Sequence, residues 1–143
     1  MKIAIGSDHA GYQLKEIIIE LLQSENYDIQ DFGTFSEESV DYPDIGRKLA
    51  EAVAAGEFDR GILICGAGIG MSIVANKVKG IRAALCSECY SAKVSIEHNN
   101  ANILVLGGRT IGTGLAGEIV RVWMSAKFDP NSRHARRVAK IES

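Results

Sequence analysis

Two periodicities of hydrophobic and polar residues alternate along the chain. Short apolar runs of the kind found in β-strands occupy residues 2–6, 27–32, 61–65, 82–86 and 102–106. Between them, apolar residues recur at the i, i+3, i+4, i+7 spacing of helices. The clearest helical sets are Leu14, Ile17, Ile18, Leu21 and Leu22; Ile45, Leu49, Ala52 and Val53; and Leu115, Ile119, Val122 and Trp123. Residues 69–77 and 91–99 supply two further helices between the later strands.

The regular alternation of strand and helix predicts an α/β fold. Its central strands are apolar on both faces, which is typical of a parallel sheet covered by helices on each side. We therefore expect a Rossmann-like three-layer sandwich with a five-stranded parallel sheet and a helical C-terminal tail. The pattern contains no repeat or linker, so residues 1–143 are predicted to form a single domain.

Composition narrows the class of protein. The 143 residues are 46% hydrophobic and 24% charged, as in an ordinary soluble protein, and no apolar run approaches the roughly 20 residues of a membrane span. The first residues read as a strand rather than a signal peptide, and three cysteines, an odd number, argue against a secreted disulfide framework. A net charge of −2 gives no general attraction to nucleic acid. We expect a cytoplasmic protein that binds neither nucleic acid nor membrane.

Chemically active residues follow four of the five expected strands. Asp8 and His9 follow the first, Cys65 ends the third, Cys86 ends the fourth and Arg109 follows the fifth. In open α/β sheets, ligands bind beyond the carboxyl ends of the strands. These side chains are therefore expected to converge at one edge of the sheet.

The sequence Cys65-Gly66-Ala67-Gly68-Ile69-Gly70 links the third strand to a helix. Glycines let the backbone turn tightly and leave its amides unshielded, and the start of a helix attracts negative charge. The same field stabilises a thiolate on the cysteine at its edge. The loop thus predicts a base or nucleophile beside an anion-binding site.

The same residues also fit other kinds of site. The loop resembles part of a dinucleotide fingerprint, with Glu88 at the spacing of a ribose-binding acid, but Met71 replaces the third glycine. It lacks the Gly-Lys-Ser/Thr ending of a phosphate-binding P-loop. Cys86 and Cys89 form a C-x-x-C pair that could join Cys65 and His98 in a zinc site. The loop could also be a plain strand–helix turn.

The histidines and the basic tail each allow a structural and a functional interpretation. Asp8 could only cap the first helix, and His98 could be a surface histidine at a helix C-terminus. The tail places four cations, Arg133, Arg136, Arg137 and Lys140, along one side of an expected helix. They form either a solvated face or a guanidinium clamp for a phosphate monoester, which could reach a second subunit.

Several segments together resemble the type B ribose-5-phosphate isomerase family, which includes galactose-6-phosphate isomerase subunits. The resemblance is carried, nearly end to end and in the family's order, by residues 5–11, 31–34, 40–43, 61–66, 75–77, 80–84 and 98–99 and by the Arg133-His134-x-x-Arg137 tail. It implies interconversion of ribose 5-phosphate and ribulose 5-phosphate through an enediolate, without metal or organic cofactor.

The resemblance also implies a role for each site residue. Cys65 would be the base that moves the proton between C2 and C1, and His98, with Asp8, would open the furanose ring. The amides of Gly66, Ala67, Gly68, Ile69 and Gly70 would hold the enediolate oxygen. The remaining sugar-phosphate ligands would be Asp8, His9, Asn99, Arg109, Arg133 and Arg137, shared between the two subunits of a homodimer.

One residue departs from the family pattern. Many members carry threonine where this chain has Ala67, so one hydroxyl that could stabilise the thiolate or enediolate is missing. Either the backbone amides suffice, or Ser72 or a water replaces it, or the favoured substrate differs. The alternatives are a hexose-6-phosphate isomerase acting on allose or galactose phosphate, and a sugar-phosphate-binding protein without catalysis.

Overall fold

Five parallel strands form one sheet. A computed structural model of the protein describes residues 1–143. The strands lie in the order β2-β1-β3-β5-β4. Their bounds are Lys2–Ser7 for β1, Asp28–Asp31 for β2, Arg60–Cys65 for β3, Ala83–Leu85 for β4 and Ile103–Gly107 for β5. The sheet is parallel throughout, as the sequence predicts.

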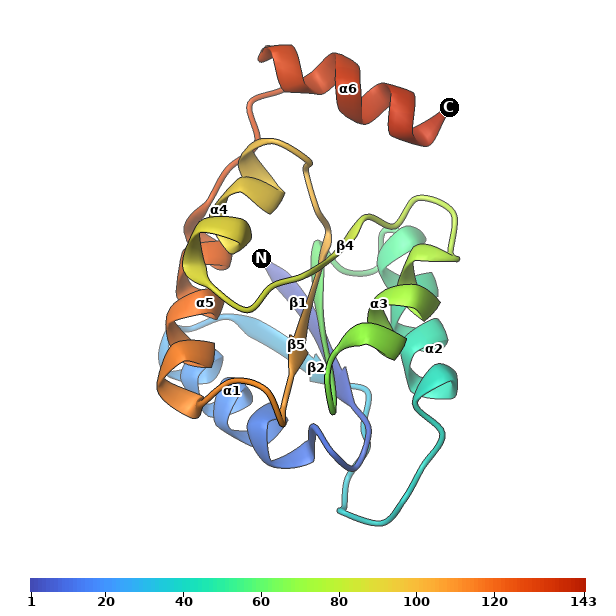
Figure 1. The fold of residues 1–143 in the computed structure, drawn as a ribbon, viewed down its shortest axis with the longest axis vertical. Coiled ribbons are helices and arrows are strands. Elements are labelled where there is room, and N and C mark those ends of the chain that lie inside the picture. Colours follow the sequence, from blue (N-terminus) through green and yellow to red (C-terminus); the bar gives the residue numbers. More distant parts are fainter.

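Helices cover both faces of this sheet and one further helix lies outside the layers (Figure 1). Helices α1, α4 and α5 cover one face, and α2 and α3 cover the other. Helix α6 lies beyond the end of the sheet at which the strands begin. Their bounds are Tyr12–Ser24 for α1, Tyr42–Ala54 for α2, Ile69–Asn76 for α3, Cys89–Glu97 for α4, Thr113–Ser125 for α5 and Arg133–Glu142 for α6. The predicted three-layer sandwich with a helical tail is confirmed.

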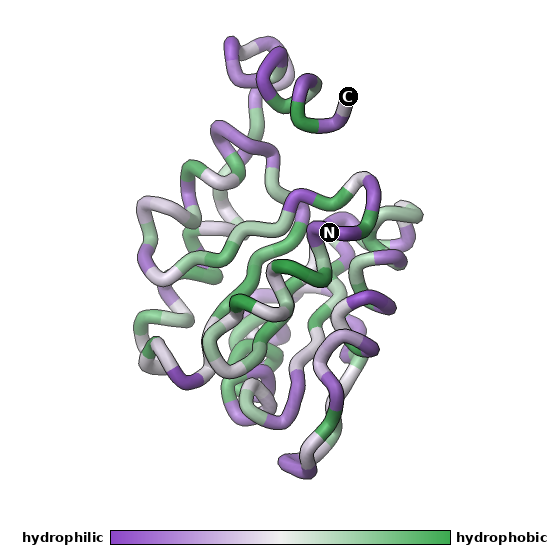
Figure 2. The backbone as a smooth tube through the Cα atoms, turned by 45° about the vertical axis from the view of Figure 1, so that its right-hand side comes forward, coloured by the Kyte–Doolittle hydropathy of each residue, from purple (hydrophilic) through white to green (hydrophobic).

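The core is divided by the sheet into two hydrophobic clusters. Alternate residues of a strand point to opposite faces, so Ile3 and Ile5 pack against α1 and α5 while Ala4 packs against α2. In Figure 2 the hydrophobic colour follows the central strands, the helices that cover the sheet carry both colours, and α6 is largely hydrophilic. The larger cluster contains the fully buried Trp123.

A topological switch point lies between β1 and β3. The chain passes from β1 to β2 on one side, then returns through α2 to β3 on the other side of β1. The two strands are paired up to Ser7 and Ile64, so Asp8 and Cys65 follow neighbouring positions. Parallel α/β sheets bind their ligands beyond such a point.

Some details of the predicted elements are wrong. Strand β2 covers four residues and β4 three, both shorter than expected. At the start of β4, Arg82 donates its N–H to the side chain of Asn102 instead of a neighbouring strand. Ile17 and Leu115, placed on buried helical faces, are each 42% exposed. The buried stripe of α1 is narrower and consists of Leu14, Lys15, Ile18 and Leu22. No helix is both long enough and apolar enough to cross a membrane.

Candidate active site

The glycine loop after β3 presents a row of unpaired amides. Gly68 has φ +81°, a left-handed conformation that favours glycine, and it forms the N-cap of α3. The backbone N–H groups of residues 66–71 donate to no other group of the chain. The loop carbonyls are held, since Cys65 and Gly66 accept the N–H groups of Gly108 and Arg109 at 2.8 and 2.9 Å. The loop therefore offers donors for a negative charge, as expected.

Cys65 lies directly before these donors. It is the last residue of β3, is 5% exposed and carries a free thiol. Its neighbour across the sheet is Gly107, where an added Cβ would lie 2.9 Å from the backbone of Ala67. The absence of a side chain at Gly107 lets the loop close over the end of β5.

Asp8 and His9 lie beside the loop at the end of β1. Asp8 is 6% exposed, and its Oδ1 accepts the N–H of Gly11 at 3.0 Å, which closes the turn that leads into α1. The N-cap of that helix is Gly11 and no side chain caps it, so the interpretation of Asp8 as the helix cap is wrong. Its other oxygen has no partner within the chain. His9 is half-buried, and its Nδ1 accepts the N–H of Val40 at 3.3 Å. A carboxylate oxygen and a ring nitrogen thus remain free for a ligand.

Arg109 completes the group at this edge. The side chain is exposed and lies over the loop, since a Cβ at Gly66 would be 3.7 Å from its Cδ and 3.8 Å from its Nη1. No carboxylate within the chain pairs with its guanidinium. An unpaired cation above unpaired amides makes this edge a strong site for an anion.

The structure places the other expected residues at the opposite edge of the sheet. Helix α4 runs antiparallel to the strands, so its last residues lie at their amino ends, and His98 is its C-cap. Asn99 lines a cavity of about 580 Å³ at that edge, with Ile81 and Ile141 among its walls. Arg133 and Arg137 lie on α6, outside this end of the sandwich (Figure 1). Within one chain the expected site residues therefore lie in two groups at opposite ends of the strands, and the sharing of a site between two subunits stays a prediction.

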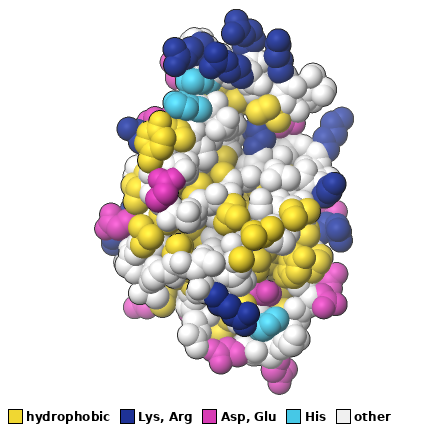
Figure 3. Space-filling model, in the orientation of Figure 1, with side chains coloured by type: hydrophobic (Ala, Val, Ile, Leu, Met, Phe, Trp, Pro, Cys, Tyr) yellow, Lys and Arg dark blue, Asp and Glu magenta, His cyan; other side chains and the backbone are white.

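His98 has a neighbour that the sequence did not indicate. Its ring stacks on that of His134, with ring centroids 4.2 Å apart and an angle of 20° between the planes. Partial burial and the nearby His98, Arg133 and Arg137 lower the pKa of His134. In Figure 3 histidine side chains lie at both ends of the molecule, and those near α6 are beneath its Lys and Arg side chains. Two imidazoles and two guanidinium groups thus lie together at this end of the molecule.

Tyr42 was also missed as a possible site residue. A Cβ at Gly70 would clash with the ring and the hydroxyl of Tyr42, so this side chain packs directly on the glycine loop. In the sequence, the only indication that Tyr42 could belong to the site is its place in residues 40–43, one of the segments that carry the family resemblance.

The zinc interpretation fails on geometry. Cys65 packs on the α2–α3 side of the sheet and Cys86 on the α1–α5 side. No three His, Cys, Asp or Glu side chains gather in the chain in a way that could hold a metal ion. The sheet itself separates the two thiols.

Comparison with known proteins gives consistent matches. Residues 3–141 match the family described as Ribose/Galactose Isomerase. Ribose-5-phosphate isomerase B of Escherichia coli K12 is 49% identical over 140 residues, which cover 98% of this chain and 93% of the relative. The structure of Clostridium thermocellum ribose-5-phosphate isomerase B has a TM-score of 0.96 at 58% identity, covering 99% and 95% of the two chains. D-erythrulose-4-phosphate isomerase of Pectobacterium atrosepticum is 45% identical over 142 residues, which cover 99% and 93%.

Fold, site and matches define an enzyme class: the protein is a sugar phosphate isomerase. The dinucleotide and P-loop interpretations of the glycine loop are accordingly set aside. More narrowly, the chain belongs to the ribose/galactose isomerase family, and its resemblance to the type B ribose-5-phosphate isomerases is confirmed.

Proposed function

We propose that the protein interconverts ribose 5-phosphate and ribulose 5-phosphate through an enediolate. The observation that carries this proposal is the free thiol of Cys65 at the start of a row of unpaired amides. Enediolate formation needs a base at the carbon acid and donors where negative charge develops on oxygen. The end of β3 offers both, and neither a metal nor an organic cofactor takes part in the proposed chemistry.

The proposed reaction begins by opening the furanose ring. The hydroxyl on C1 loses its proton while the ring oxygen gains one, with His98 and Asp8 as the exchanging groups. The thiolate of Cys65 then takes the proton from C2, and the electrons of that bond pass to the C1 carbonyl oxygen. The loop amides stabilise the resulting enediolate. Transfer of the remaining hydroxyl proton from O2 to O1, and return of the thiol proton to C1, give the ketose.

We propose that a second copy of the chain supplies part of each site. His98, Asn99, Arg133 and Arg137 of one subunit would face Asp8, His9, Arg109 and the glycine loop of the other. Guanidinium groups are suited to bidentate capture of phosphate, and no carboxylate of the chain pairs with Arg133 or Arg137. Binding the phosphate at a distance from the reacting carbons orients the sugar, which can supply several kcal/mol of the barrier.

An exposed apolar surface beside the loop supports this assembly. It consists of Ile69 and Ile73 of α3, Leu85 of β4 and Tyr90 of α4, which are 57%, 56%, 41% and 70% exposed. In Figure 3 hydrophobic side chains gather on the face that contains α3 and β4. Contiguous apolar surface of this kind is typical of interaction sites.

The three free cysteines fit the reducing cytoplasm, the location that we propose.

The same activity assay distinguishes two alternative functions. A hexose 6-phosphate such as that of allose or galactose could be the better substrate, and the four-carbon substrate named for the Pectobacterium relative widens the choice. A protein that only binds sugar phosphate would show affinity without ketose formation. Turnover compared among ribose, allose and galactose phosphates distinguishes these cases.

The test of the base uses two cysteine variants. Cys65→Ala should lower turnover of ribose 5-phosphate by at least about 10³-fold, because it removes the group that accepts the carbon-bound proton. Cys89→Ala, at a half-buried cysteine with no proposed role, is the matched control and should retain full activity. Equal activity of the two variants would contradict the proposed role of Cys65.

A further inference from the structure

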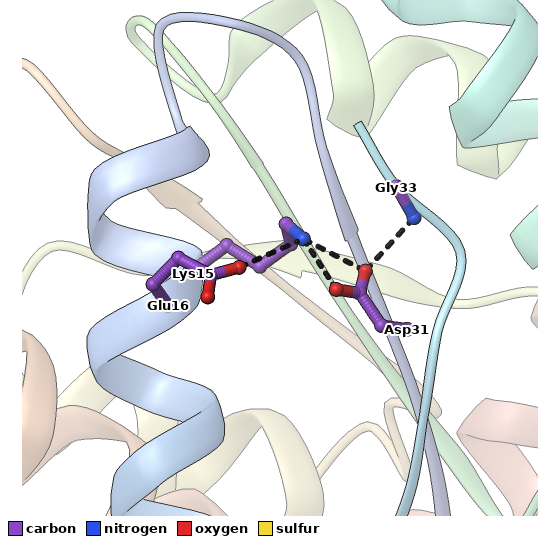
Figure 4. Close-up of polar contacts among 4 residues, drawn as sticks. All are labelled: Lys15, Glu16, Asp31 and Gly33. Carbon is purple, nitrogen blue, oxygen red and sulfur yellow. Dashed lines mark hydrogen bonds and ion pairs between the residues drawn. The ribbon is translucent and has the colours of Figure 1, made fainter. Parts of the chain in front are cut away.

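Lys15 is the only lysine whose side chain is fully buried, and the reaction proposed above gives it no task. Its Nζ donates to both carboxylate oxygens of Asp31, at 2.8 and 2.6 Å, and to Oε1 of Glu16 at 3.3 Å (Figure 4). The rings of Tyr12 and Phe35 lie beside the ammonium, with centroids 5.4 and 5.2 Å away. The ammonium is thus enclosed by carboxylates and aromatic rings.

Stability alone is a weak reason for such a pair. Removing the ammonium from water is costly, while the side chains of Asp31 and Glu16 stay 27% and 51% exposed. Even a fully buried ion pair can often be replaced by apolar side chains with a neutral or stabilising effect. The geometry offers a second reason. Oδ1 of Asp31 also accepts the N–H of Gly33 at 2.8 Å, so the carboxylate joins α1 to the chain that leaves β2 (Figure 4).

That chain, residues 32–41, has no helix or strand and is called here the bridging segment. Gly33 accepts the N–H of Ser7 at 2.6 Å, and Thr34 donates to the carbonyl of Ser7 at 2.7 Å. Ser7 immediately precedes Asp8. Farther along, Val40 donates to Nδ1 of His9, and the segment leads directly into Tyr42, the first residue of α2, which packs on the glycine loop. The bridging segment therefore runs from the ion pair past the end of β1 to the candidate active site.

The bond from Val40 has a chemical consequence for His9. A neutral imidazole has one N–H and one acceptor nitrogen. Because Nδ1 accepts the amide proton of Val40, the ring proton must be on Nε2, which is then a donor for a substrate oxygen. The position of Val40 therefore selects both the tautomer and the orientation of this ring.

We propose that Lys15 and Asp31 are positioning residues: their ion pair holds Gly33, sets the path of the bridging segment and thereby fixes His9 as an Nε2–H donor in the substrate site. The effect on substrate binding depends on the function proposed above. The effect on the tautomer of His9 does not.

The test compares three variants. Lys15→Met keeps an unbranched chain but leaves the carboxylate of Asp31 without its cation. The double variant Lys15→Met/Asp31→Leu replaces the pair by apolar side chains and leaves the N–H of Gly33 without its acceptor. Lys48→Met, at an exposed lysine of α2 without a hydrogen bond, is the matched control. The measurements are the thermal midpoint, kcat and KM for ribose 5-phosphate, and the ¹⁵N spectrum of the His9 ring, assigned with a His9→Gln variant.

The proposal expects the wild type and Lys48→Met to show the Nε2–H tautomer. The single variant and the double variant should both show a mixture of His9 tautomers. In both, KM should rise about tenfold with a smaller change in kcat, because a contact to the bound substrate is weakened. The decisive observation is the double variant, whose thermal midpoint should recover while KM and the tautomer stay altered. If both return to their wild-type values in the double variant, the pair is only structural and the proposal is wrong. If the wild type lacks isomerase activity, the proposed function fails, and the spectrum still decides the positioning role.

Discussion

Cys65 and Cys86 show how differently two buried cysteines can be placed. Both end or follow strands of the sheet, and they are 5% and 2% exposed. Cys65 is followed by a row of unpaired N–H groups. Burial and the nearby carboxylate of Glu88 instead raise the pKa of Cys86 to about 11, although a hydrogen bond with Ser95 opposes the shift. The surroundings of Cys86 therefore predict an unreactive thiol, whereas Cys65 borders the loop that we propose to bind negative charge.

This contrast predicts the pH dependence of alkylation. A raised pKa reduces the thiolate fraction, so at about pH 8 only about one Cys86 in a thousand is ionised. Iodoacetamide should leave Cys86 unmodified there while it labels Cys89, and labelling of Cys86 should rise only as the pH approaches 11. Peptide mass spectrometry measures both sites in one sample, and guanidinium-unfolded protein is the control in which both react. Equal labelling in the folded protein at the lower pH would contradict the assigned surroundings of Cys86.

Glu88 shows why spacing alone can mislead. Its distance from the glycine loop suits a ribose-binding acid, one of the alternatives raised by the sequence. In the structure it is the N-cap of α4, and its two oxygens accept the N–H of Ser91 at 3.1 and 2.9 Å. These bonds lower the pKa of Glu88. A capping residue and a ligand-binding acid follow a strand at similar positions, so only coordinates separate them.

The site depends on how closely α1 approaches β3. Gly11 is the N-cap of α1, and a Cβ there would lie 2.6 Å from the carbonyl oxygen of Ile64. The contact joins two backbones, which cannot move apart as a flexible side chain could. It holds the turn that contains Asp8 against the strand that ends in Cys65.

Gly11→Ala should therefore destabilise the fold by about 2–3 kcal/mol, the usual cost of overpacking a tight contact. The matched control is Gly114→Ala in the first turn of α5, where a Cβ would meet nothing within 4 Å. That variant should be stabilised by about 0.5–1 kcal/mol, because alanine loses less backbone entropy in a helix. Chemical unfolding measures both. A Gly11→Ala protein as stable as the wild type would show that α1 and β3 can separate without cost.

The order of strands and helices was predictable because each element carries its own period of apolar residues. The same pattern placed Asp8, Cys65 and Arg109 at the carboxyl edge, since each directly follows a strand. It did not place His98, because the end of a returning helix lies at the opposite edge. Its ring stacks on that of His134, which is 36 residues away in sequence and belongs to a helix outside the sandwich. Contacts of this kind have no local signature.

Helix α6 places its arginines at the end of the molecule opposite to Cys65. Within one chain it is anchored by Val138, which is buried, and by an ion pair between Arg82 and Glu142 at 2.6 Å. Its Arg133 and Arg137 lie beyond the amino edge of the sheet, while Cys65 lies beyond the carboxyl edge. One chain therefore holds the proposed base at one end and the proposed phosphate clamp at the other.

If two chains bring these two groups together, two inactive variants should restore each other. Cys65→Ala and His98→Ala, each with a different affinity tag, are co-expressed, and heteromers that carry both tags are purified. Each variant alone should be inactive. In a mixed dimer one site receives both substitutions and the other receives neither, so about half of the wild-type activity should return. A site built within one chain would contain one substitution in every copy, and the mixed protein would stay inactive. Restored activity would thus show that Cys65 and His98 act across a subunit boundary. If no activity returned, both groups would have to act within one chain, and α6 and α4 would have to move toward the glycine loop.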